Sequence, residues 1–132
     1  MNQSLSPVCV YTIRHHQDLD EAYHSGGNGR FTENTTWNTG QRLFLEAKKN
    51  HQRMPVVFAT AGIGTDSLIY YAMLKDVEIN ESDSTTTYEF TDLQRIATHH
   101  PLSSLTLRST NRPLSDNYIR PYAICLTPYF VE

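Results

Sequence analysis

Two apolar runs joined by a glycine-rich turn constrain the fold more than any other feature of the chain. The runs are residues 55–61, PVVFATA, and residues 67–79, SLIYYAMLKDVEI, and the linking segment is GIGTD. Both runs are rich in β-branched and aromatic residues, which favour strands. The glycines on either side of Ile63 permit the positive φ values that tight hairpin turns require. We therefore expect an antiparallel β-hairpin, which commits the chain to building a sheet.

Other short runs predict further elements on either side of this hairpin. PVCVYTIR, residues 7–14, combines β-branched and aromatic residues after a proline and predicts the first strand. The polar segment after it favours a short helix over residues 18–24, before the turn residues SGGNG. YEFTDLQRI, residues 88–96, predicts a strand that passes into a short helical turn, and residues 122–126 predict a last strand.

One segment has the apolar spacing of a principal helix. It begins near Asn38, whose side chain can cap the free amides, and Gln41 three residues later completes a capping box. Pro55 closes the segment. The apolar stripe consists of Leu43, Phe44 and Ala47, and the basic residues Lys48, Lys49, His51 and Arg53 at the far end complement the helix dipole. Strands around one principal helix predict an α+β fold with a mixed, barrel-like sheet.

Length, charge and cysteine content restrict the class of protein. The chain has 132 residues, of which 39% are apolar, so we expect a single domain over residues 1–132. A net charge of -3 argues against a protein that coats nucleic acid electrostatically, while leaving room for a local basic face. Cys9 and Cys125 lie in apolar runs without metal-binding spacing, which predicts buried, reduced thiols. No signal peptide or membrane span is recognisable, so we expect a soluble, cytoplasmic protein.

Motifs for catalysis and for metal or cofactor binding are lacking in the sequence. It contains no GxSxG, no phosphate-binding loop of the Walker type and no HExxH. Four histidines form two adjacent pairs, and adjacent side chains diverge too far to chelate one ion unaided. We therefore expect no metal and no cofactor. Acid–base chemistry by His15 or His16 with Asp18 or Asp20 stays open, because histidine titrates near neutrality.

The only tryptophan, Trp37, allows two interpretations. Its polar neighbours, TENTT, favour a partly open ring on which a nucleobase could stack. Alternatively, Trp37 covers the end of the Leu43 and Phe44 stripe as a hydrophobic staple. Tyr70 and Tyr71 alternate across a strand, so one is expected in the core and the other at the surface or in a pocket.

The order of these elements resembles the PUA-like superfamily, most closely YTH domains, with EVE and ASCH domains as close alternatives. The likeness covers residues 8–124. It rests on the spacing of Trp37, Thr39, Leu43 and Ala47, on VVFATA and LIYYAML, and on the late segment from Leu102 and Leu105 to RPLS. It implies a partly open β-barrel with a principal helix and short flanking helices, and a pocket between the barrel mouth and the start of the tryptophan helix. YTH domains bind RNA carrying N6-methyladenine in an aromatic cage, EVE domains are thought to recognise modified DNA bases, and ASCH domains include RNA-binding and nuclease members.

The resemblance also implies which residues form the pocket. Trp37 would be one wall of the cage. The loop after the first strand would contact the base and the backbone, although two histidines stand there in place of the family's small polar residues. The base-binding set is then Trp37, Arg14, His15, His16, Asn38, Thr39, Tyr70 and Tyr71.

A second group of residues could contact phosphates. It consists of Lys48, Lys49, Arg53, Arg108 and Arg112, with Arg120, and the alternative is that these are scattered surface charges. We expect a non-enzymatic module that binds RNA or DNA with a modified or flipped base, or a nucleotide-like small molecule. The alternatives are an RNA hydrolase or nuclease that uses His15 and His16, and an interaction protein without a working pocket. Tyr129 and Phe130 would suit a homodimer contact if they are exposed.

Overall fold

The two strands of the expected hairpin are antiparallel neighbours in the sheet. In the computed structural model, which describes residues 4–60, 67–115 and 122–131, β5 (Pro55–Thr60) pairs with β6 (Ser67–Asn80) from Pro55 opposite Met73 to Ala59 opposite Leu68. The GIGTD turn lies outside the described residues. The prediction of two antiparallel strands is therefore confirmed, and the conformation of the turn stays a prediction.

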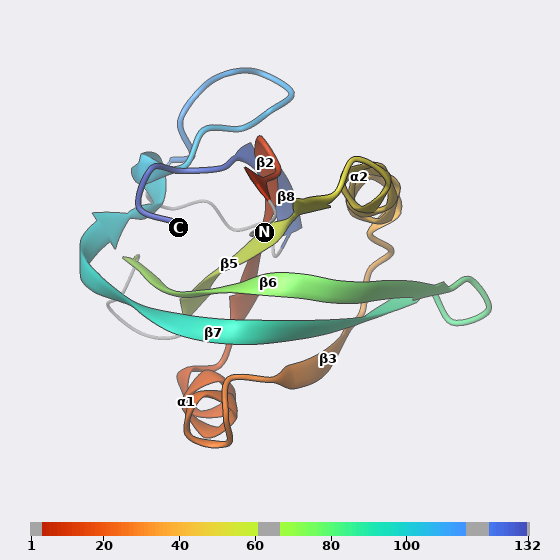
Figure 1. The fold of residues 1–132 in the computed structure, drawn as a ribbon, viewed down its shortest axis with the longest axis horizontal. Helices are drawn as coiled ribbons and strands as arrows, with labels where there is room; N and C mark the ends of the chain where they lie inside the picture. The colour runs from red at the N-terminus through yellow and green to blue at the C-terminus, as the bar shows by residue number, and fades with distance from the viewer. Residues whose placement is uncertain (1–3, 61–66, 116–121, 132) are drawn as a thin grey trace.

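In the described part of the chain six strands form the main sheet, and this sheet together with two helices confirms the α+β class (Figure 1). The strands besides β5 and β6 are β2 (Val8–Arg14), β3 (Gly29–Glu33), β7 (Thr85–Pro101) and β8 (Tyr122–Leu126). Their order is β3-β7-β6-β5-β2-β8. The β2–β5 pair is parallel and the other pairs are antiparallel, so the sheet is mixed. Among the described residues β3 and β8 do not pair with each other, so the sheet is open.

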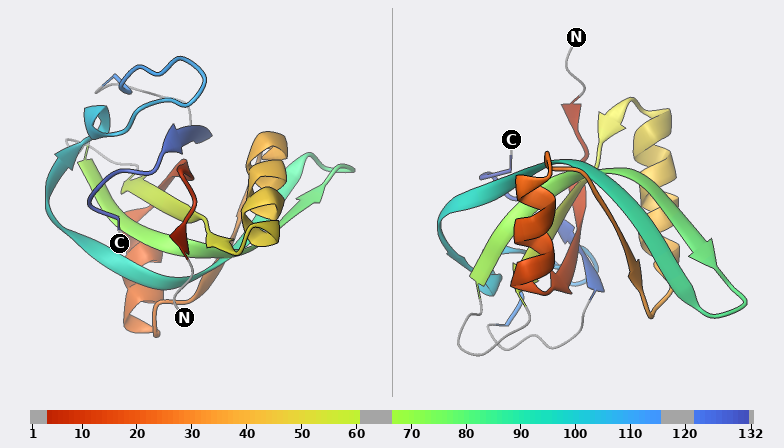
Figure 2. Two further views of the ribbon diagram at one scale, coloured as in Figure 1. Left: turned by 45° about the horizontal axis from the view of Figure 1, so that its top comes forward. Right: turned by 90° about the horizontal axis from the view of Figure 1, so that it is seen from below.

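Two helices lie in the crossover between the parallel strands β2 and β5. They are α1 (His16–His24) and α2 (Asn38–Lys49), and β3 runs between them. Parallel neighbours require such a long connection, because a tight turn joins only antiparallel strands. The remaining elements are small: β1 (Ser4–Leu5) pairs with β4 (Gln52–Arg53), and η1 (Leu102–Ser104) follows β7. Figure 2 shows the long strands β6 and β7 running side by side in an arc.

The central strands β2 and β5 are buried on both of their faces. Val8 and Val10 of β2 belong to a core that includes Leu19 of α1 and Phe44 of α2, so the two helices cover one face. Residues at alternate positions of a strand point to opposite faces. Cys9 accordingly belongs to a second core, which the segments after β7 and after β8 complete.

The two cysteines lie opposite each other in neighbouring strands. Cys9 of β2 and Cys125 of β8 are register partners, and both are buried and free, as the sequence predicted. Burial raises the pKa of the Cys125 thiol to about 12 and that of Cys9 well above its usual value. Since the thiolate is the reactive form, both thiols are poor nucleophiles.

Two local predictions are wrong. Residues 91–96 do not form a helical turn but continue β7, because β6 offers hydrogen-bonding partners along this stretch, with register shifts that absorb the bending. The start of α2 is not capped by Asn38. Trp37 is the N-cap residue and no side chain bonds to the cap, while the Gln41 amide donates to the carbonyl oxygen of Val77.

No helix in the described part of the chain combines the length and the apolar character that crossing a membrane would need.

Candidate functional site

Trp37 lies between two tyrosine rings in the core. Its indole is 0% exposed, and it stacks on Tyr88 with ring centroids 4.5 Å apart and on Tyr122 with centroids 5.0 Å apart. The backbone N–H of Trp37 donates to the hydroxyl of Thr86 at 2.9 Å, which ties the start of α2 to β7. Of the two interpretations of Trp37, the structure therefore shows the core one. A base can stack on the indole only if one tyrosine moves away.

The two tyrosines differ in their surroundings. Tyr88 is fully buried on the core side, whereas Tyr122 is half-buried on the outer side. The Tyr122 hydroxyl accepts a hydrogen bond of 2.8 Å from the backbone N–H of Gly40 in the first turn of α2. Gly40 is needed for this contact, since a Cβ there would lie 2.9 Å from the Tyr122 oxygen. Among the described residues the indole Nε1–H of Trp37 has no hydrogen-bond partner.

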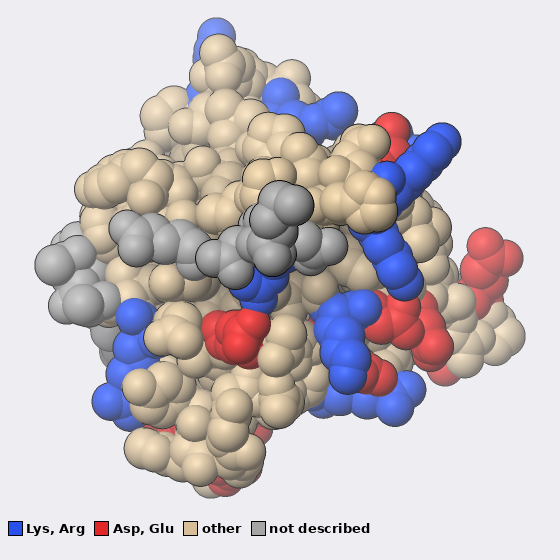
Figure 3. Space-filling model, viewed as in Figure 1, with Lys and Arg blue, Asp and Glu red and all other residues tan. Residues whose placement is uncertain are grey.

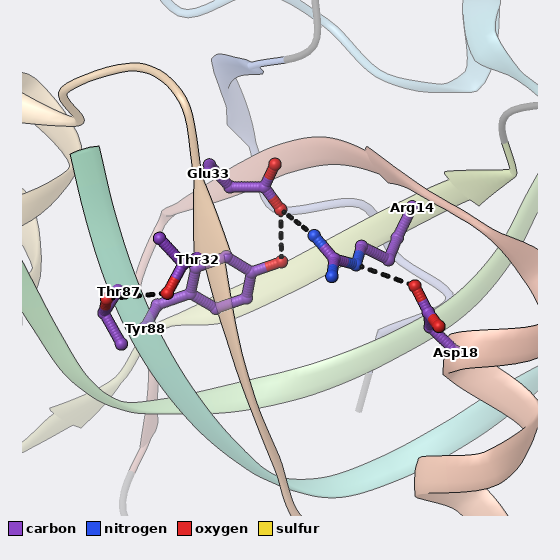
Figure 4. Close-up of polar contacts among 6 residues, drawn as sticks. All are labelled: Arg14, Asp18, Thr32, Glu33, Thr87 and Tyr88. Atoms are coloured by element: carbon purple, nitrogen blue, oxygen red, sulfur yellow. Dashed lines mark hydrogen bonds and ion pairs between the residues drawn. The ribbon is translucent and has the colours of Figure 1, made fainter. Parts of the chain in front are cut away.

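Arg14, at the end of β2, connects this stack to α1 (Figure 4). Its guanidinium lies 3.0 Å from a carboxylate oxygen of Glu33 and 3.3 Å from one of Asp18, and it covers the ring of Phe31. The Tyr88 hydroxyl donates to the same Glu33 oxygen at 3.3 Å. Burial raises the pKa of Glu33, and Arg14 opposes that shift. Arg14 therefore joins β3 to α1, and the two carboxylates neutralise the charge that a ligand would need.

A second polar cluster lies between α1 and the sheet. The Tyr70 hydroxyl donates to a carboxylate oxygen of Asp20, and the same oxygen lies 3.4 Å from Nε2 of His16. On the other side, Nε of Arg95 donates to the Tyr70 oxygen at 3.1 Å. These residues line a hollow of about 290 Å³ that opens between α1, β6 and β7. The structure therefore brings two predicted site residues, His16 and Tyr70, together at a place away from Trp37.

The other predicted base-binding residues lie apart from this hollow. His15 precedes α1 as its N-cap residue and is exposed. Asn38 and Thr39 are exposed on the first turn of α2, beside Trp37. Tyr71 packs half-buried against the core on the opposite face of the sheet from Tyr70, as strand alternation predicts.

The predicted phosphate-contacting residues differ in their exposure and in their contacts. Lys48, Lys49, Arg108 and Arg112 are exposed, whereas Arg53 is half-buried and bonded to Asp92. Lys48 and Lys49 end α2, and Arg108 shares a hollow of about 220 Å³ with residues of α2 and β2. Figure 3 shows acidic and basic side chains intermixed on one side of the face it presents. Arg120 lies outside the described residues.

Residues that the sequence did not single out complete both clusters. Tyr88, Tyr122 and Glu33 surround Trp37 and Arg14. At α1, Arg95 lines the hollow and its guanidinium lies over the ring of Tyr23. No local sequence pattern links these residues to their contact partners, since the two members of each contact come from different strands or helices. The alternation of Tyr88 and Phe90 was the one available signal that Tyr88 faces the core.

The described residues show what chemistry is available. No three histidine, cysteine, aspartate or glutamate side chains among them gather closely enough to hold a metal ion. A comparison with models of known protein families and with characterised proteins finds no significant match. The described residues therefore offer stacking on aromatic rings, hydrogen-bond donation from Arg95 and acid–base chemistry from a histidine–aspartate pair.

Replacing Tyr70 with phenylalanine is expected to raise the pKa of Asp20 towards its ordinary value. The hydrogen bond from Tyr70 is the main cause that lowers the pKa of this carboxyl. A lowered folded-state pKa stabilises the fold above the unfolded-state pKa, and this contribution is lost as the pH falls through the folded-state pKa. The variant should lose less stability on acidification. Carboxyl NMR titration measures the shift, and Tyr71→Phe, whose ring is across the sheet, should leave Asp20 unchanged.

Proposed function

We propose that the chain binds a planar, nucleobase-like ligand against the outer face of Trp37, at the place that the Tyr122 ring occupies in this structure. The ligand is a plain or modified base of RNA or DNA, or a nucleotide-like small molecule. The observation on which this rests is the position of Tyr122, which lies within 10° of parallel to the indole and accepts a hydrogen bond from Gly40 N–H. An aromatic ring with an oxygen acceptor therefore already fits this place.

The stacking energies favour a base over the Tyr122 ring on the outer face of Trp37. Base stacking on an aromatic side chain contributes about 1–3 kcal/mol, and a tyrosine–tryptophan stack contributes about 0.5–1.5 kcal/mol beyond its buried area. A base carbonyl can accept the Gly40 N–H bond that Tyr122 gives up.

The sequence resemblance supports the same place. The PUA-like likeness implies a base pocket at the start of the tryptophan helix, and Trp37 is the N-cap residue of α2. The open, mixed sheet and the helices on one of its faces support a PUA-like fold for this chain. Asn38 and Thr39 are exposed on the same turn and supply polar groups for the edge of a base.

Tyr122→Ala is expected to tighten the binding of short oligonucleotides about 3- to 10-fold, because the ligand no longer displaces a ring worth about 1 kcal/mol. Trp37 is the only tryptophan, so its fluorescence reports the site directly. Oligonucleotides with plain or methylated bases should quench it saturably in both proteins. Tyr129→Ala, which removes a tyrosine 86% exposed at another place, is the matched control and should bind like the unchanged protein.

One result with Tyr122→Ala would contradict the proposal. If Tyr122→Ala shifts Trp37 emission to the red, which shows an opened indole, and no oligonucleotide or nucleotide quenches it, the proposal is wrong.

The His16–Asp20 pair favours a second candidate, an RNA hydrolase or nuclease. The pair spans 3.4 Å, close enough for Asp20 to orient the imidazole as a general base. Cleavage of a labelled RNA that is lost in His16→Ala would select this candidate, and binding without cleavage would select the first.

A further inference from the structure

Arg95 is held in place without being neutralised. Its Nε donates to Tyr70 at 3.1 Å, and its guanidinium carbon lies 4.6 Å from the centroid of the Tyr23 ring. In the described part of the chain no ion pair joins Arg95 to a carboxylate. Four other arginines do form such pairs, namely Arg14, Arg30, Arg42 and Arg53.

Two strands and a helix fix this geometry. Tyr70 of β6 and Arg95 of β7 are register partners, so their side chains leave the sheet side by side. Tyr23 comes from α1 and lies 5.7 Å from Tyr70, centroid to centroid. The contacts occupy Nε and one face of the guanidinium. Among the described residues no hydrogen bond or ion pair engages its two terminal nitrogens, which leaves them for a ligand in the hollow of about 290 Å³, where Ile69 and Ile96 form apolar walls.

Asp20 also lines the hollow, and its negative charge is engaged by other groups. Asp20 accepts the Tyr70 hydroxyl and faces His16 at 3.4 Å. His16 also lines the hollow and adds positive charge when protonated. A guanidinium that is fixed by other contacts loses little entropy on binding and matches the oxygens of a phosphate with two parallel bonds.

We propose that the hollow between α1, β6 and β7 binds a phosphate group, with Arg95 as its main contact. The phosphate belongs to a free nucleotide or to a nucleic-acid backbone, which present the same chemistry. The site shares no residue with the Trp37 site, so either site can fail without the other.

The test follows amide and arginine side-chain NMR signals of β6 and β7 while inorganic phosphate, a nucleoside 5′-monophosphate or a short oligonucleotide is added. For inorganic phosphate we expect a dissociation constant of about 1 mM, and Arg95→Gln should weaken it about tenfold or more, because a charged, two-bond contact is lost. Arg42→Gln is the matched control, since Arg42 is an exposed arginine on α2, and it should bind phosphate as the unchanged protein does.

The variant Asp20→Asn tests the proposal independently, by the direction in which the phosphate affinity changes. It removes a negative charge beside the hollow and keeps an oxygen for the Tyr70 hydroxyl, so phosphate should bind several-fold more tightly. Weaker binding in this variant would overturn the proposal, because it would show that Asp20 attracts the ligand. Equal affinity of Arg95→Gln and the unchanged protein, with equal unfolding midpoints in urea, would also overturn it, as would the absence of any shift with all three ligands.

The three ligands distinguish the source of the phosphate. Similar affinities for inorganic phosphate and the mononucleotide support recognition of the phosphate alone, and tighter binding of the oligonucleotide supports a backbone contact. In Arg95→Gln the oligonucleotide can still shift the NMR signals while inorganic phosphate no longer does. That result supports two separate sites, one at Arg95 and one elsewhere.

Discussion

Replacing Trp37 with alanine is expected to lower the free energy of unfolding by about 3–5 kcal/mol. The side chain is 0% exposed and both of its faces are covered by tyrosine rings, so its removal leaves a cavity that Tyr88 cannot fill without leaving Glu33. The loss also removes the ring contacts of the start of α2 with β7 and β8, while the backbone N–H groups of residues 37 and 40 keep their hydrogen bonds to Thr86 and Tyr122. Urea unfolding followed by circular dichroism measures the change, since the variant has no tryptophan fluorescence.

Two variants set the scale for this result. Trp37→Phe keeps a flat ring between the tyrosines and should cost clearly less than the alanine variant. Leu45→Ala removes a side chain that is 55% exposed on α2, and it should change the stability by about 0.5 kcal/mol or less. If Trp37→Ala matches Leu45→Ala, the indole is not part of the core and the description of the stack is wrong.

The sequence predicted the elements that have a local pattern. The strands β2, β5, β6 and β8 follow from runs of apolar, β-branched and aromatic residues, and the helix α2 follows from apolar residues about 3.6 positions apart. The extent of β7 did not follow, because polar residues interrupt its alternation and pairing with β6 decides its conformation. Local patterns describe what a segment favours, and a neighbouring strand can override that preference.

The site was harder to predict than the fold. The surroundings of Trp37 depend on Tyr88 and Tyr122, which come from β7 and β8, two strands separated by three others in the sheet. Polar neighbours in the sequence suggested an open ring, yet the side chain points away from them into the core. The pairing of Tyr70 with Arg95 is equally remote from any sequence pattern, since it depends on the register of β6 and β7.

Gly29 is the position at which a single added methyl group should disturb the sheet most. Gly29 of β3 lies opposite Phe90 of β7, and a Cβ there would come within 2.3 Å of the Phe90 ring. The ring is 1% exposed and packs against Phe31 and Phe58, so it has no free space into which it can move. Gly29→Ala is therefore expected to cost about 2–3 kcal/mol in urea unfolding, although its backbone conformation suits alanine.

A second substitution separates this steric cost from the general cost of changing an edge strand. In Phe90→Leu the end of the ring that would meet the methyl group is gone, so Gly29→Ala should cost less in that background than in the unchanged protein. The two substitutions should therefore be non-additive by about 1 kcal/mol or more. Strict additivity would show that Phe90 does not lie over Gly29. It would also weaken the argument for Trp37, because Phe90 and Tyr88 enter the same core from the same strand.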